Sequence, residues 1–457
     1  MLSLDDVLKA TGGAPEAGLG PTLITGISTD TRSLQAGSLY VPLKGAKFDG
    51  HDFLEEAVRR GATLALISRE VDVPKGLGVI RVQDTLASYG DLARYWREKL
   101  GLKVVAITGS SGKTSTKEMV ASLLGHYMPV GKTHANYNNE IGLPRTLLET
   151  PPETRACVLE MGMRGPGEIA YLTSIARPDV GILTNVGTAH IGRLGSREAI
   201  ARAKGELLRI GGPTMSAVVN HDDTYAMAQA SDHPGPMATF SLHDSKATVW
   251  AEGTGRTFVA HWQEGPSMKA GSVRVTLPFL GDHHRANALA AIATAWHLGL
   301  SLPAALAIAP EALPGRARTL SVGGVDIVDE TYNANPESMR LTLEAFCQEE
   351  CKGRRFVAVG QMGELGDYAV TAHRELGEQL ARLPIAGVVT MGELGQHVAD
   401  ALPGISAHVA DHAAGAEALA SWLKPGDRLF VKGSRSMQME VLISLLVQNL
   451  EGKATPR

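Results

Sequence analysis

Cysteine is scarce in this chain, with three among 457 residues. Cys347 and Cys351 are four residues apart, and no second pair completes a zinc site. The sequence therefore predicts neither a structural metal nor a disulfide framework. This cysteine usage fits a reducing compartment, and we expect a cytoplasmic protein.

The chain also lacks a large charge excess and a segment typical of a membrane span. Its formal net charge is −4, which gives no bulk attraction to nucleic acid or anionic lipid. The most apolar stretch, Ala288 to Ala309, contains His297, Gly299 and Pro303, and it is interpreted as two helices of a soluble protein. The acidic first residues do not have the order of a secretory signal. We expect no nucleic-acid partner and no membrane span.

Length and composition indicate a large α/β protein. A chain of this length exceeds a single core and suggests about three domains, which we place at residues 1–100, 101–313 and 314–457. The apolar content of 44% and the 51 glycines fit an α/β fold. Strands and helices alternate from Arg355 to Leu450, which is typical of a doubly wound parallel sheet.

One stretch carries the clearest chemical signal. An apolar run from Val104 to Thr108 precedes a helical pattern, and the loop between them reads Gly109, Ser110, Ser111, Gly112, Lys113 and Thr114. Strand, glycine loop and helix form a phosphate cradle, because loop N–H groups and the helix N-terminus attract anions. Lys113 is then placed to reach the outer phosphates and Thr114 to ligate Mg²⁺. Ile107 stands where such loops usually have their first glycine, so the loop is a shortened variant. The alternative is an ordinary strand-to-helix turn.

Glu160 and His190 follow two strands of buried type, Ala156–Leu159 and Val180–Leu183. A carboxylate at the end of a strand beside a phosphate loop is where a nucleotide enzyme places a metal ligand. Two alternatives stay open: a capping or surface acid for Glu160, and a hydrogen-bonded structural group for His190.

Lys204 lies in an apolar stripe, in one helical row with Ile200 and Leu208. Desolvation there lowers the pKa of a lysine and raises its share of neutral amine. A neutral amine can react with CO₂ to give a carbamate, which is an oxygen ligand for Mg²⁺. The default for such a position is a lysine whose ammonium reaches solvent.

Three other polar positions are candidates for ligand contacts. Asp30 and Arg32 share a face on an extended chain, which suits a polar ligand and equally a surface salt bridge. Three amides within residues 136–139 indicate either turn chemistry or a polar ligand. Asn287 stands near the start of an alanine-rich helix, where it caps the helix or contacts a base edge.

Taken together, these stretches resemble the Mur ligases of bacterial cell-wall synthesis, in order and over nearly the whole chain. The family-wide marks are Thr108–Thr114, Glu160, Asn185–His190, Lys204, Asn287 and Pro314–Arg316. Four more motifs are similar to the members that add D-alanyl-D-alanine: Phe48–Asp52, Asn138–Gly142, Tyr332–Pro336 and Lys432–Met437.

The resemblance implies three α/β domains: an N-terminal UDP-binding domain, a central P-loop ATPase domain with a mostly parallel sheet, and a C-terminal Rossmann-like, doubly wound domain. It implies an ATP-dependent ligase that joins D-alanyl-D-alanine to UDP-N-acetylmuramoyl-tripeptide through an acyl phosphate, releasing ADP and phosphate. Such an enzyme would act in cytoplasmic peptidoglycan precursor synthesis, and we expect a monomer.

The resemblance also implies roles for individual residues. Lys113, Lys204, His190 and Arg316 would be catalytic. ATP would be held by residues 109–114, with Asn287 on adenine, Glu330 on the ribose and Arg316 on the terminal phosphate. Thr114 and Glu160 would bind one Mg²⁺, and His190 and carbamylated Lys204 a second. The substrate-binding residues would be Ser28, Thr29, Asp30 and Arg32 for UDP, Asn333, Asn335, Lys432, Ser434 and Arg435 for the dipeptide, and also Asn138 and Asn139.

Three positions depart from the family pattern, and one of them is Pro42, which interrupts a usually apolar strand and fits a strand edge. His284 stands where asparagine is common, and Glu330 stands where a second aspartate is common; both concern adenosine contacts and not the reaction. Two other hypotheses remain. One is a different amide ligase on this scaffold, such as a relative adding diaminopimelate or a glutamate-tail synthetase. The other is an ATP-gated binding protein without catalysis.

Overall fold

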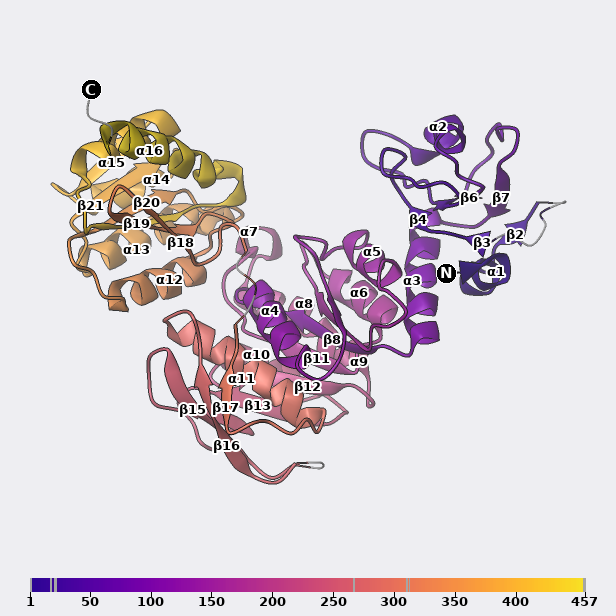
Figure 1. The fold of residues 1–457 in the computed structure, drawn as a ribbon, viewed down its shortest axis with the longest axis horizontal. Helices are drawn as coiled ribbons and strands as arrows, with labels where there is room; N and C mark the ends of the chain where they lie inside the picture. The colour runs from indigo at the N-terminus through magenta and orange to yellow at the C-terminus, as the bar shows by residue number, and fades with distance from the viewer. Residues whose placement is uncertain are drawn as a thin grey trace.

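The protein is described by a computed structural model that covers residues 2–16, 19, 23–265, 268–309, 311 and 313–454. These residues form three α/β units in chain order. The N-terminal and C-terminal units stand on opposite sides of the central one (Figure 1). The predicted α/β class is therefore confirmed.

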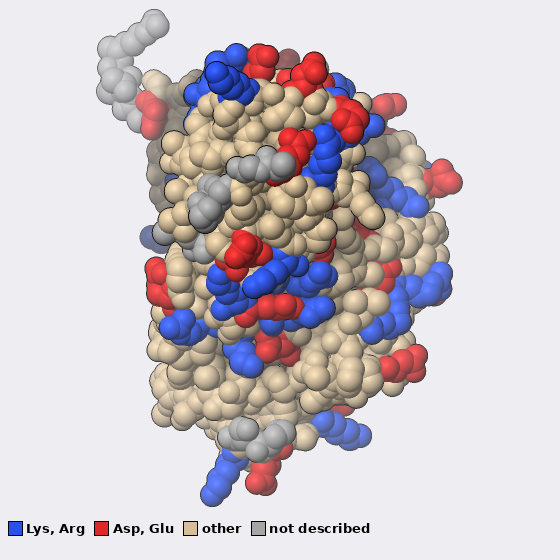
Figure 2. All heavy atoms as spheres, turned by 90° about the vertical axis from the view of Figure 1, so that its right-hand side faces the viewer, with Lys and Arg blue, Asp and Glu red and all other residues tan. Residues whose placement is uncertain are grey.

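The N-terminal unit contains a five-stranded sheet of order β2-β7-β6-β5-β4 and a two-stranded sheet of β1 and β3. Its strands are β1 (Leu2–Ser3), β2 (Ala14–Pro15), β3 (Leu23–Ile24), β4 (Ile27–Ser28), β5 (Leu39–Tyr40), β6 (Leu64–Ile67) and β7 (Gly78–Arg81). Its helices are α1 (Leu4–Thr11), the 3-10 turn η1 (Gly50–Phe53) and α2 (Leu54–Arg59). Figure 2 shows the molecule from the right-hand side of Figure 1, and basic and acidic side chains are interspersed on this face.

Helix α3 (Thr85–Leu100) connects the N-terminal unit to the central one. It packs against α1 on one side and against α5 (Gly142–Leu148) and α6 (Glu168–Ala176) on the other. Two polar contacts reach in both directions: Lys99 Nζ lies 2.7 Å from Asp6 Oδ2, and the Trp96 indole donates to the Thr150 carbonyl at 3.2 Å. One helix therefore holds both units.

The central unit is built on a ten-stranded sheet of order β17-β16-β15-β14-β13-β12-β11-β8-β10-β9. Only β15 runs antiparallel to its neighbours β14 and β16, so the sheet is mostly parallel, as predicted. The strands are β8 (Lys103–Thr108), β9 (Val130–Lys132), β10 (Ala156–Glu160), β11 (Val180–Leu183), β12 (Ser216–Asn220), β13 (Met237–Ser241), β14 (Val249–Glu252), β15 (Thr257–Trp262), β16 (Gly271–Thr276) and β17 (Ala305–Ala307).

Helices cover both faces of this sheet, which explains the continuous apolar sequence of its inner strands. One core lies under α4 and α11, and the other lies under α5, α6, α8, α9 and α10. Besides α5 and α6, the helices of the central unit are α4 (Lys113–Leu124), α7 (Ile191–Leu194), α8 (Arg197–Lys204), α9 (Glu206–Gly211), α10 (Thr224–Ala230) and α11 (Asp282–His297).

The apolar stretch from Ala288 to Ala309 differs from its prediction. It holds the end of one helix, α11, and the short edge strand β17 in place of a second helix. The chain leaves α11 through Gly299, whose φ of 67° is left-handed, and Pro303 disfavours a new helix at the residue before it. In the described part of the chain no helix is long and apolar enough to cross a membrane.

The C-terminal unit has a six-stranded sheet of order β18-β19-β23-β20-β21-β22, parallel except for the hairpin β18–β19. This confirms the predicted doubly wound sheet. Its strands are β18 (Arg318–Val322), β19 (Val325–Glu330), β20 (Arg355–Gly360), β21 (Gly387–Met391), β22 (Ser406–Val409) and β23 (Arg428–Lys432). Its helices are α12 (Pro336–Gln348), η2 (Gly366–Tyr368), α13 (Ala369–Ala381), α14 (Gly395–Asp400), α15 (His412–Trp422), η3 (Arg435–Met437) and α16 (Met439–Ala454).

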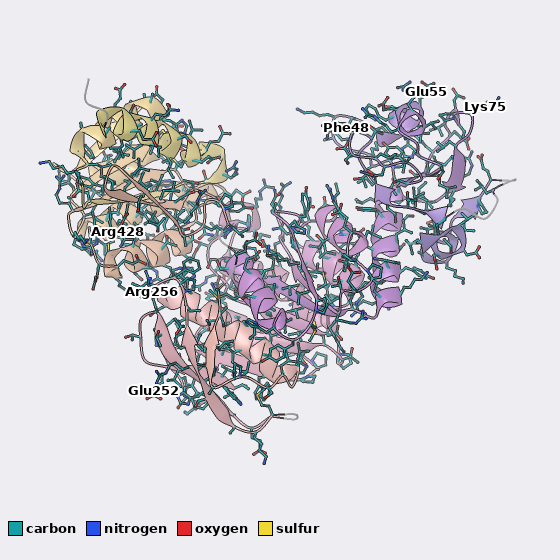
Figure 3. The ribbon with its side chains drawn as sticks, viewed as in Figure 1. Phe48, Glu55, Lys75, Glu252, Arg256 and Arg428 are labelled. Carbon is teal, nitrogen blue, oxygen red and sulfur yellow. The ribbon has the colours of Figure 1, made fainter. Side chains whose placement is uncertain are left out.

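The C-terminal unit meets the central unit at two ends of α12. At the far end, Glu349 lies 2.8 Å from Arg256 of the central unit and 2.7 Å from Arg428 of its own sheet. The two arginines lie on facing sides of this junction (Figure 3). At the near end, α7 packs against η2, beside the residues predicted to bind phosphate and metal.

Candidate active site

A cavity of about 770 Å³ opens between the central and C-terminal units. Its central side is lined by the phosphate loop, the ends of β10 and β11, and the start of α11. Its C-terminal side is lined by α12, the end of β19 and Lys432. A cavity of this size suits a ligand as large as a nucleotide.

The glycines of the phosphate loop are required by close approach. Gly112 has a φ of 77°, and a Cβ there would lie 2.8 Å from Asn287 Oδ1. A Cβ at Gly109 would overlap the hydroxyl of Thr184. The Ser111 N–H donates to Asn185 Oδ1 at 2.9 Å, so the neighbouring strand end fixes the loop.

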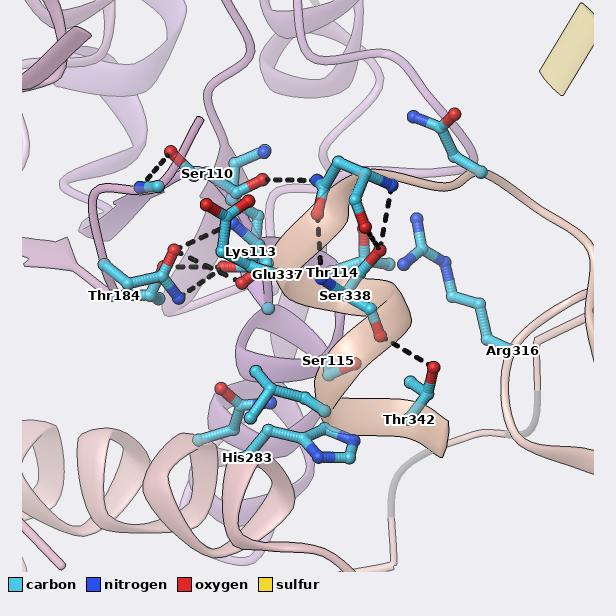
Figure 4. A pocket seen from close by; sticks show the side chains of 18 of the residues that line it. Ser110, Lys113, Thr114, Ser115, Thr184, His283, Arg316, Glu337, Ser338 and Thr342 are labelled. Carbon is cyan, nitrogen blue, oxygen red and sulfur yellow. Dashed lines mark hydrogen bonds between the residues drawn. The ribbon is translucent and has the colours of Figure 1, made fainter. Parts of the chain in front are cut away.

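Helix α4 starts at Lys113 without a side-chain cap. Its first turn, with Thr114 and Ser115, lines the cavity next to Ser110 of the loop (Figure 4). Uncapped N–H groups at a helix N-terminus attract anions. The loop and helix therefore have the geometry expected of the predicted phosphate cradle.

Two lysines lie at the base of this loop. Lys113 Nζ donates to the Gly109 carbonyl at 2.7 Å, and Lys204 Nζ donates to the same oxygen at 3.0 Å. Burial lowers the pKa of Lys204 well below its ordinary value, and the nearby Lys113 lowers it further. Burial also lowers the pKa of Lys113, with Glu160 opposing the shift and Arg316 adding to it. Lys204 is 1% exposed, which confirms its predicted desolvation.

Glu160 is held by the predicted Mg²⁺ ligand and by an amide. Thr114 Oγ1 donates to Glu160 Oε2 at 2.7 Å, and Asn138 Nδ2 donates to Glu160 Oε1 at 2.8 Å. Glu160 is 4% exposed and ends β10. The alternative of a surface acid is therefore excluded for Glu160, and Asn138 is one of the donors that orient its carboxylate.

His190 faces the cavity from the segment between β11 and α7. Its backbone is left-handed, with a φ of 68°, and its Nδ1 lies 2.6 Å from Glu364 Oε2 of the C-terminal unit. The imidazole beside Glu364 holds the pKa of that carboxyl below its usual value, although burial opposes the shift. The candidate metal ligand therefore already contacts a carboxylate from across the junction.

A second acid from the C-terminal unit reaches the same segment. Glu337 Oε1 accepts from the N–H of Thr188 at 2.7 Å and from its hydroxyl at 3.0 Å. Asn335 caps α12 through the Ser338 N–H at 2.8 Å, and its Nδ2 donates to the Ser110 carbonyl at 3.4 Å. The start of α12 is thus seated on the phosphate loop (Figure 4).

The residues present fit a nucleotide with Mg²⁺. The Thr114 hydroxyl and the Glu160 carboxylate are hard oxygen donors side by side, and Mg²⁺ on a nucleotide uses one or two such groups together with phosphates and water. The side-chain amide nitrogen of Asn287 is buried under the loop without a partner. In the described ranges no three His, Cys, Asp or Glu side chains gather as a metal site.

Three family profiles match the chain. The profile described as Mur ligase family, catalytic domain, matches residues 23–97; Mur ligase middle domain matches residues 107–295; and Mur ligase, glutamate ligase domain, matches residues 315–435. A Synechocystis protein named UDP-N-acetylmuramoyl-tripeptide–D-alanyl-D-alanine ligase is 39% identical, with 93% of each chain covered. A Bacillus subtilis protein of the same name is 34% identical, with 94% of each covered.

The chain belongs to the Mur ligase family. Among solved structures, MurF from Acinetobacter baumannii superposes with a TM-score of 0.87 at 32% identity, covering 97% of this chain and 98% of that one. The MurF ligase from Thermotoga maritima in complex with ADP gives a TM-score of 0.82 at 29% identity, covering 94% and 98%.

In this Mur ligase, three more predicted residues line the cavity from the C-terminal side. The Arg316 guanidinium lies 4.0 Å over the Tyr332 ring. Lys432 Nζ lies 3.2 Å from Glu330 Oε2, while Glu330 Oε1 accepts from the Ala317 N–H at 2.9 Å. Burial lowers the pKa of Lys432, and Glu330 opposes this shift.

The structure excludes one of the two alternatives for Asn287, the helix cap. Asn287 does not cap a helix, because α11 begins five residues earlier at Asp282; its Oδ1 accepts from Thr116 Oγ1 at 3.1 Å. His283 and His284 both line the cavity, with ring centroids 4.0 Å apart. Burial lowers the pKa of His283 to about 4, and it lowers that of His284 well below its ordinary value.

The remaining substrate candidates are divided between the units. Asn139, Asn333 and Asn335 line the cavity, whereas Ser28, Thr29, Asp30 and Arg32, as well as Ser434 and Arg435, are not among its lining residues. Asp30 and Arg32 lie in a turn and not on an extended strand, and they pair with each other at 2.6 Å.

Sequence reasoning missed Glu337 and Glu364 of this Mur ligase. Their partners Thr188 and His190 belong to another unit, so sequence spacing carries no sign of the pairing. Glu364 lies in the glycine-rich segment from Gly360 to Gly366. Its position after a strand of a doubly wound sheet was the one available signal.

Proposed function

We propose that this chain joins D-alanyl-D-alanine to UDP-N-acetylmuramoyl-tripeptide, using ATP and releasing ADP and phosphate. The observation that carries this is the cradle at residues 109–114 with Glu160 beside it, in a cavity that the C-terminal unit closes on one side. Curated relatives over nearly the full chain bear the name of this ligase, and a related MurF ligase was solved with ADP.

The chemistry explains why these residues gather. A carboxylate and an amine do not condense in neutral water, so transfer of the γ-phosphoryl group of ATP first makes an acyl phosphate with a good leaving group. This step brings two anions together. Lys113, Arg316 and the α4 N-terminus supply positive charge at that point, and Mg²⁺ supplies more when it is bound. The dipeptide amine then attacks the acyl carbon, and phosphate leaves.

We propose two Mg²⁺ positions. Thr114 and Glu160 would hold one with the nucleotide, and His190 and a carbamylated Lys204 would serve the second. The buried, low-pKa amine of Lys204 supports the carbamate, because only a neutral amine reacts with CO₂. Lys204 does not line the cavity, so the added carboxylate would have to extend past the Gly109 carbonyl to reach a metal.

The substrates would lie across all three units. Ser28, Thr29, Asp30 and Arg32 would hold the UDP end, and Asn287 and Glu330 the adenosine. The dipeptide would be held by Asn333, Asn335, Lys432, Ser434 and Arg435, and Asn138 and Asn139 would be further substrate-binding residues. We retain 1–100, 101–313 and 314–457 as the proposed domains. A monomer acting in the cytoplasm fits an activity that uses ATP and a nucleotide-linked precursor.

A phosphate-release assay tests this function. ATP and Mg²⁺ are supplied with UDP-muramoyl-tripeptide and D-alanyl-D-alanine, or with the same acid and no amine. Two further reactions offer the substrates of other amide ligases: UDP-muramoyl-alanyl-glutamate with diaminopimelate, and a folate with glutamate. We expect phosphate release together with an amide product of matching mass for D-alanyl-D-alanine alone. Faster product formation with diaminopimelate or glutamate would assign a different amide ligase, and ATP binding without any product would assign a binding protein.

A further inference from the structure

Glu160 is fixed at its backbone as well as at its carboxylate. Its N–H donates to Thr133 Oγ1 at 3.0 Å, and Thr133 is fully buried. Thr133 directly follows β9, the edge strand beside β10. The hydroxyl of one threonine therefore holds the residue whose carboxylate faces the nucleotide site.

This contact replaces a regular step of the β-ladder. The Thr133 N–H donates to the Val158 carbonyl at 3.0 Å, as expected for a parallel pair. In the next step of such a ladder the Glu160 N–H would donate to the Thr133 carbonyl. Here that carbonyl accepts instead from Lys117 Nζ at 2.6 Å, and the Thr133 hydroxyl takes the Glu160 N–H.

Lys117 is itself an unusual residue at this place. It is 1% exposed, and its Nζ also lies 2.9 Å from Glu118 Oε1, while Glu118 Oε2 lies 2.6 Å from Lys132 Nζ. Burying a lysine is costly unless its charge is paired and hydrogen-bonded. Both conditions are met here, and one of the hydrogen bonds goes to Thr133.

The contacts form a closed ring on helix α4. Thr114 and Lys117 lie on the same helix face, one turn apart. The Thr114 hydroxyl donates to the Glu160 carboxylate, and the Glu160 N–H donates to the Thr133 hydroxyl. The Thr133 carbonyl then accepts from Lys117, which is again on α4. The phosphate-loop helix thus fixes both ends of Glu160.

We propose that Thr133 is a positioning residue, which sets the Glu160 carboxylate against Thr114 for Mg²⁺, and that Lys117 keeps the Thr133 hydroxyl available by occupying its carbonyl. This rests on the proposed ATP-dependent function, since it concerns the Mg²⁺ that accompanies the nucleotide. Residues that orient metal ligands typically change metal affinity by about 10- to 100-fold when they are replaced.

The test compares Thr133→Val, which removes the hydroxyl at nearly constant shape, with Thr133→Ser, which keeps it. The affinity for a non-hydrolysable ATP analogue is measured without Mg²⁺ and over a Mg²⁺ titration. In Thr133→Val we expect the Mg²⁺ concentration at half-effect to rise about tenfold, with an unchanged Mg²⁺-free affinity. The melting temperature should fall modestly, because the buried Glu160 N–H loses its acceptor. Thr133→Ser should match the wild type. The matched control is Thr294→Val, a fully buried threonine whose hydroxyl donates to the Ala290 carbonyl within α11.

An unchanged Mg²⁺ titration in Thr133→Val would overturn the proposal. An equal loss of affinity with and without Mg²⁺ would also overturn it, because the threonine would then only support the fold. The double variant Lys117→Met with Glu118→Gln removes both buried charges and should shift the Mg²⁺ titration in the same direction as Thr133→Val. A Mg²⁺ titration equal to that of the wild type would refute the role of Lys117. Wild-type ligation is assayed in parallel: if it fails, the proposed function falls, whereas a wild-type ligase with an unaffected Thr133→Val variant refutes this proposal alone.

Discussion

Lys113 and Lys204 share one acceptor, the Gly109 carbonyl oxygen, at 2.7 and 3.0 Å. Two ammonium groups at one oxygen repel each other, and the proximity of Lys113 contributes to the low pKa of Lys204. In this arrangement the Lys113 ammonium donates to a carbonyl of its own loop. Phosphate oxygens in the cavity would offer Lys113 a charged acceptor in place of that carbonyl.

Lys204→Ala should reduce ligation by at least about a hundredfold, as expected when a metal ligand or its support is lost. Short carboxylic acids such as acetate or formate should restore part of the activity, because their carboxylate can replace the carbamate in the space that the side chain leaves. Phosphate release is measured with and without the acid. Lys103→Ala, at a lysine whose side chain is 61% exposed, is the control. Full activity in Lys204→Ala would refute the carbamate.

The stability of the protein should depend on pH through Lys204. Its pKa is lowered by burial in the folded state, so the unfolded chain binds more protons at every pH between the folded pKa and 10.5. Stability then rises with pH in this window by up to about 1.4 kcal/mol per pH unit. Lys204→Met abolishes this contribution. In CO₂-free buffer its melting temperature should exceed that of the wild type by a margin that shrinks from about pH 8 to about pH 10; a constant margin would contradict the shift.

Glu330→Gln should destabilise the C-terminal unit by about 3 kcal/mol, because it removes the carboxylate that pairs with the buried ammonium of Lys432 and leaves Asp329 as the remaining acid that acts on it. The double variant Glu330→Gln with Lys432→Met should recover most of this loss. Melting temperatures of the four proteins give the comparison. Equal loss in the single and double variants would show that the pair does not balance a buried charge.

Glu337→Ala should loosen the contact between the C-terminal unit and the segment that carries His190. The Thr188 N–H then loses its acceptor at 2.7 Å, and its hydrogen exchange should accelerate by about tenfold, equal to about 1.4 kcal/mol. Mass spectrometry of the peptide that contains Thr188 measures this. The control is Glu344→Ala, on the same helix, whose carboxylate pairs with Arg340 of that helix. Unchanged exchange in Glu337→Ala would mean that the two units are held elsewhere.

Much of the architecture could be predicted because its causes are local. The apolar run at β8, the loop glycines and the helical spacing after Lys113 lie within about twenty residues, and the structure places all three as expected. The alternation of strands and helices after Arg355 likewise identified the C-terminal sheet. The position of Lys204 in an apolar stripe predicted its burial.

The rest of the site depends on contacts between distant parts of the chain. Glu337 and Thr188 are 149 residues apart, and Asn335 and Ser110 are 225 apart. Neither pair has a spacing that sequence periodicity could detect. The role of Thr133 was equally hidden, since a buried threonine beside an edge strand is ordinary until its carbonyl is seen to be occupied by Lys117. The capping alternative for Asn287 is excluded because α11 starts earlier than the pattern indicated, and helix starts are uncertain by a few residues.

Helix α3 sets the spacing between the N-terminal and central units. Its 16 residues extend about 24 Å, and it belongs to the packing of both units that it joins. The C-terminal unit is attached differently, by side-chain contacts, by the packing of α7 against η2 and by a backbone hydrogen bond from the Gly192 N–H to the Glu364 carbonyl. Under the proposed function, the length of α3 sets a minimum length for the acid substrate. A nucleotide-linked acid too short to extend from the turn at residues 28–32 to the phosphate loop would bind at its UDP end and never present its carboxylate to ATP.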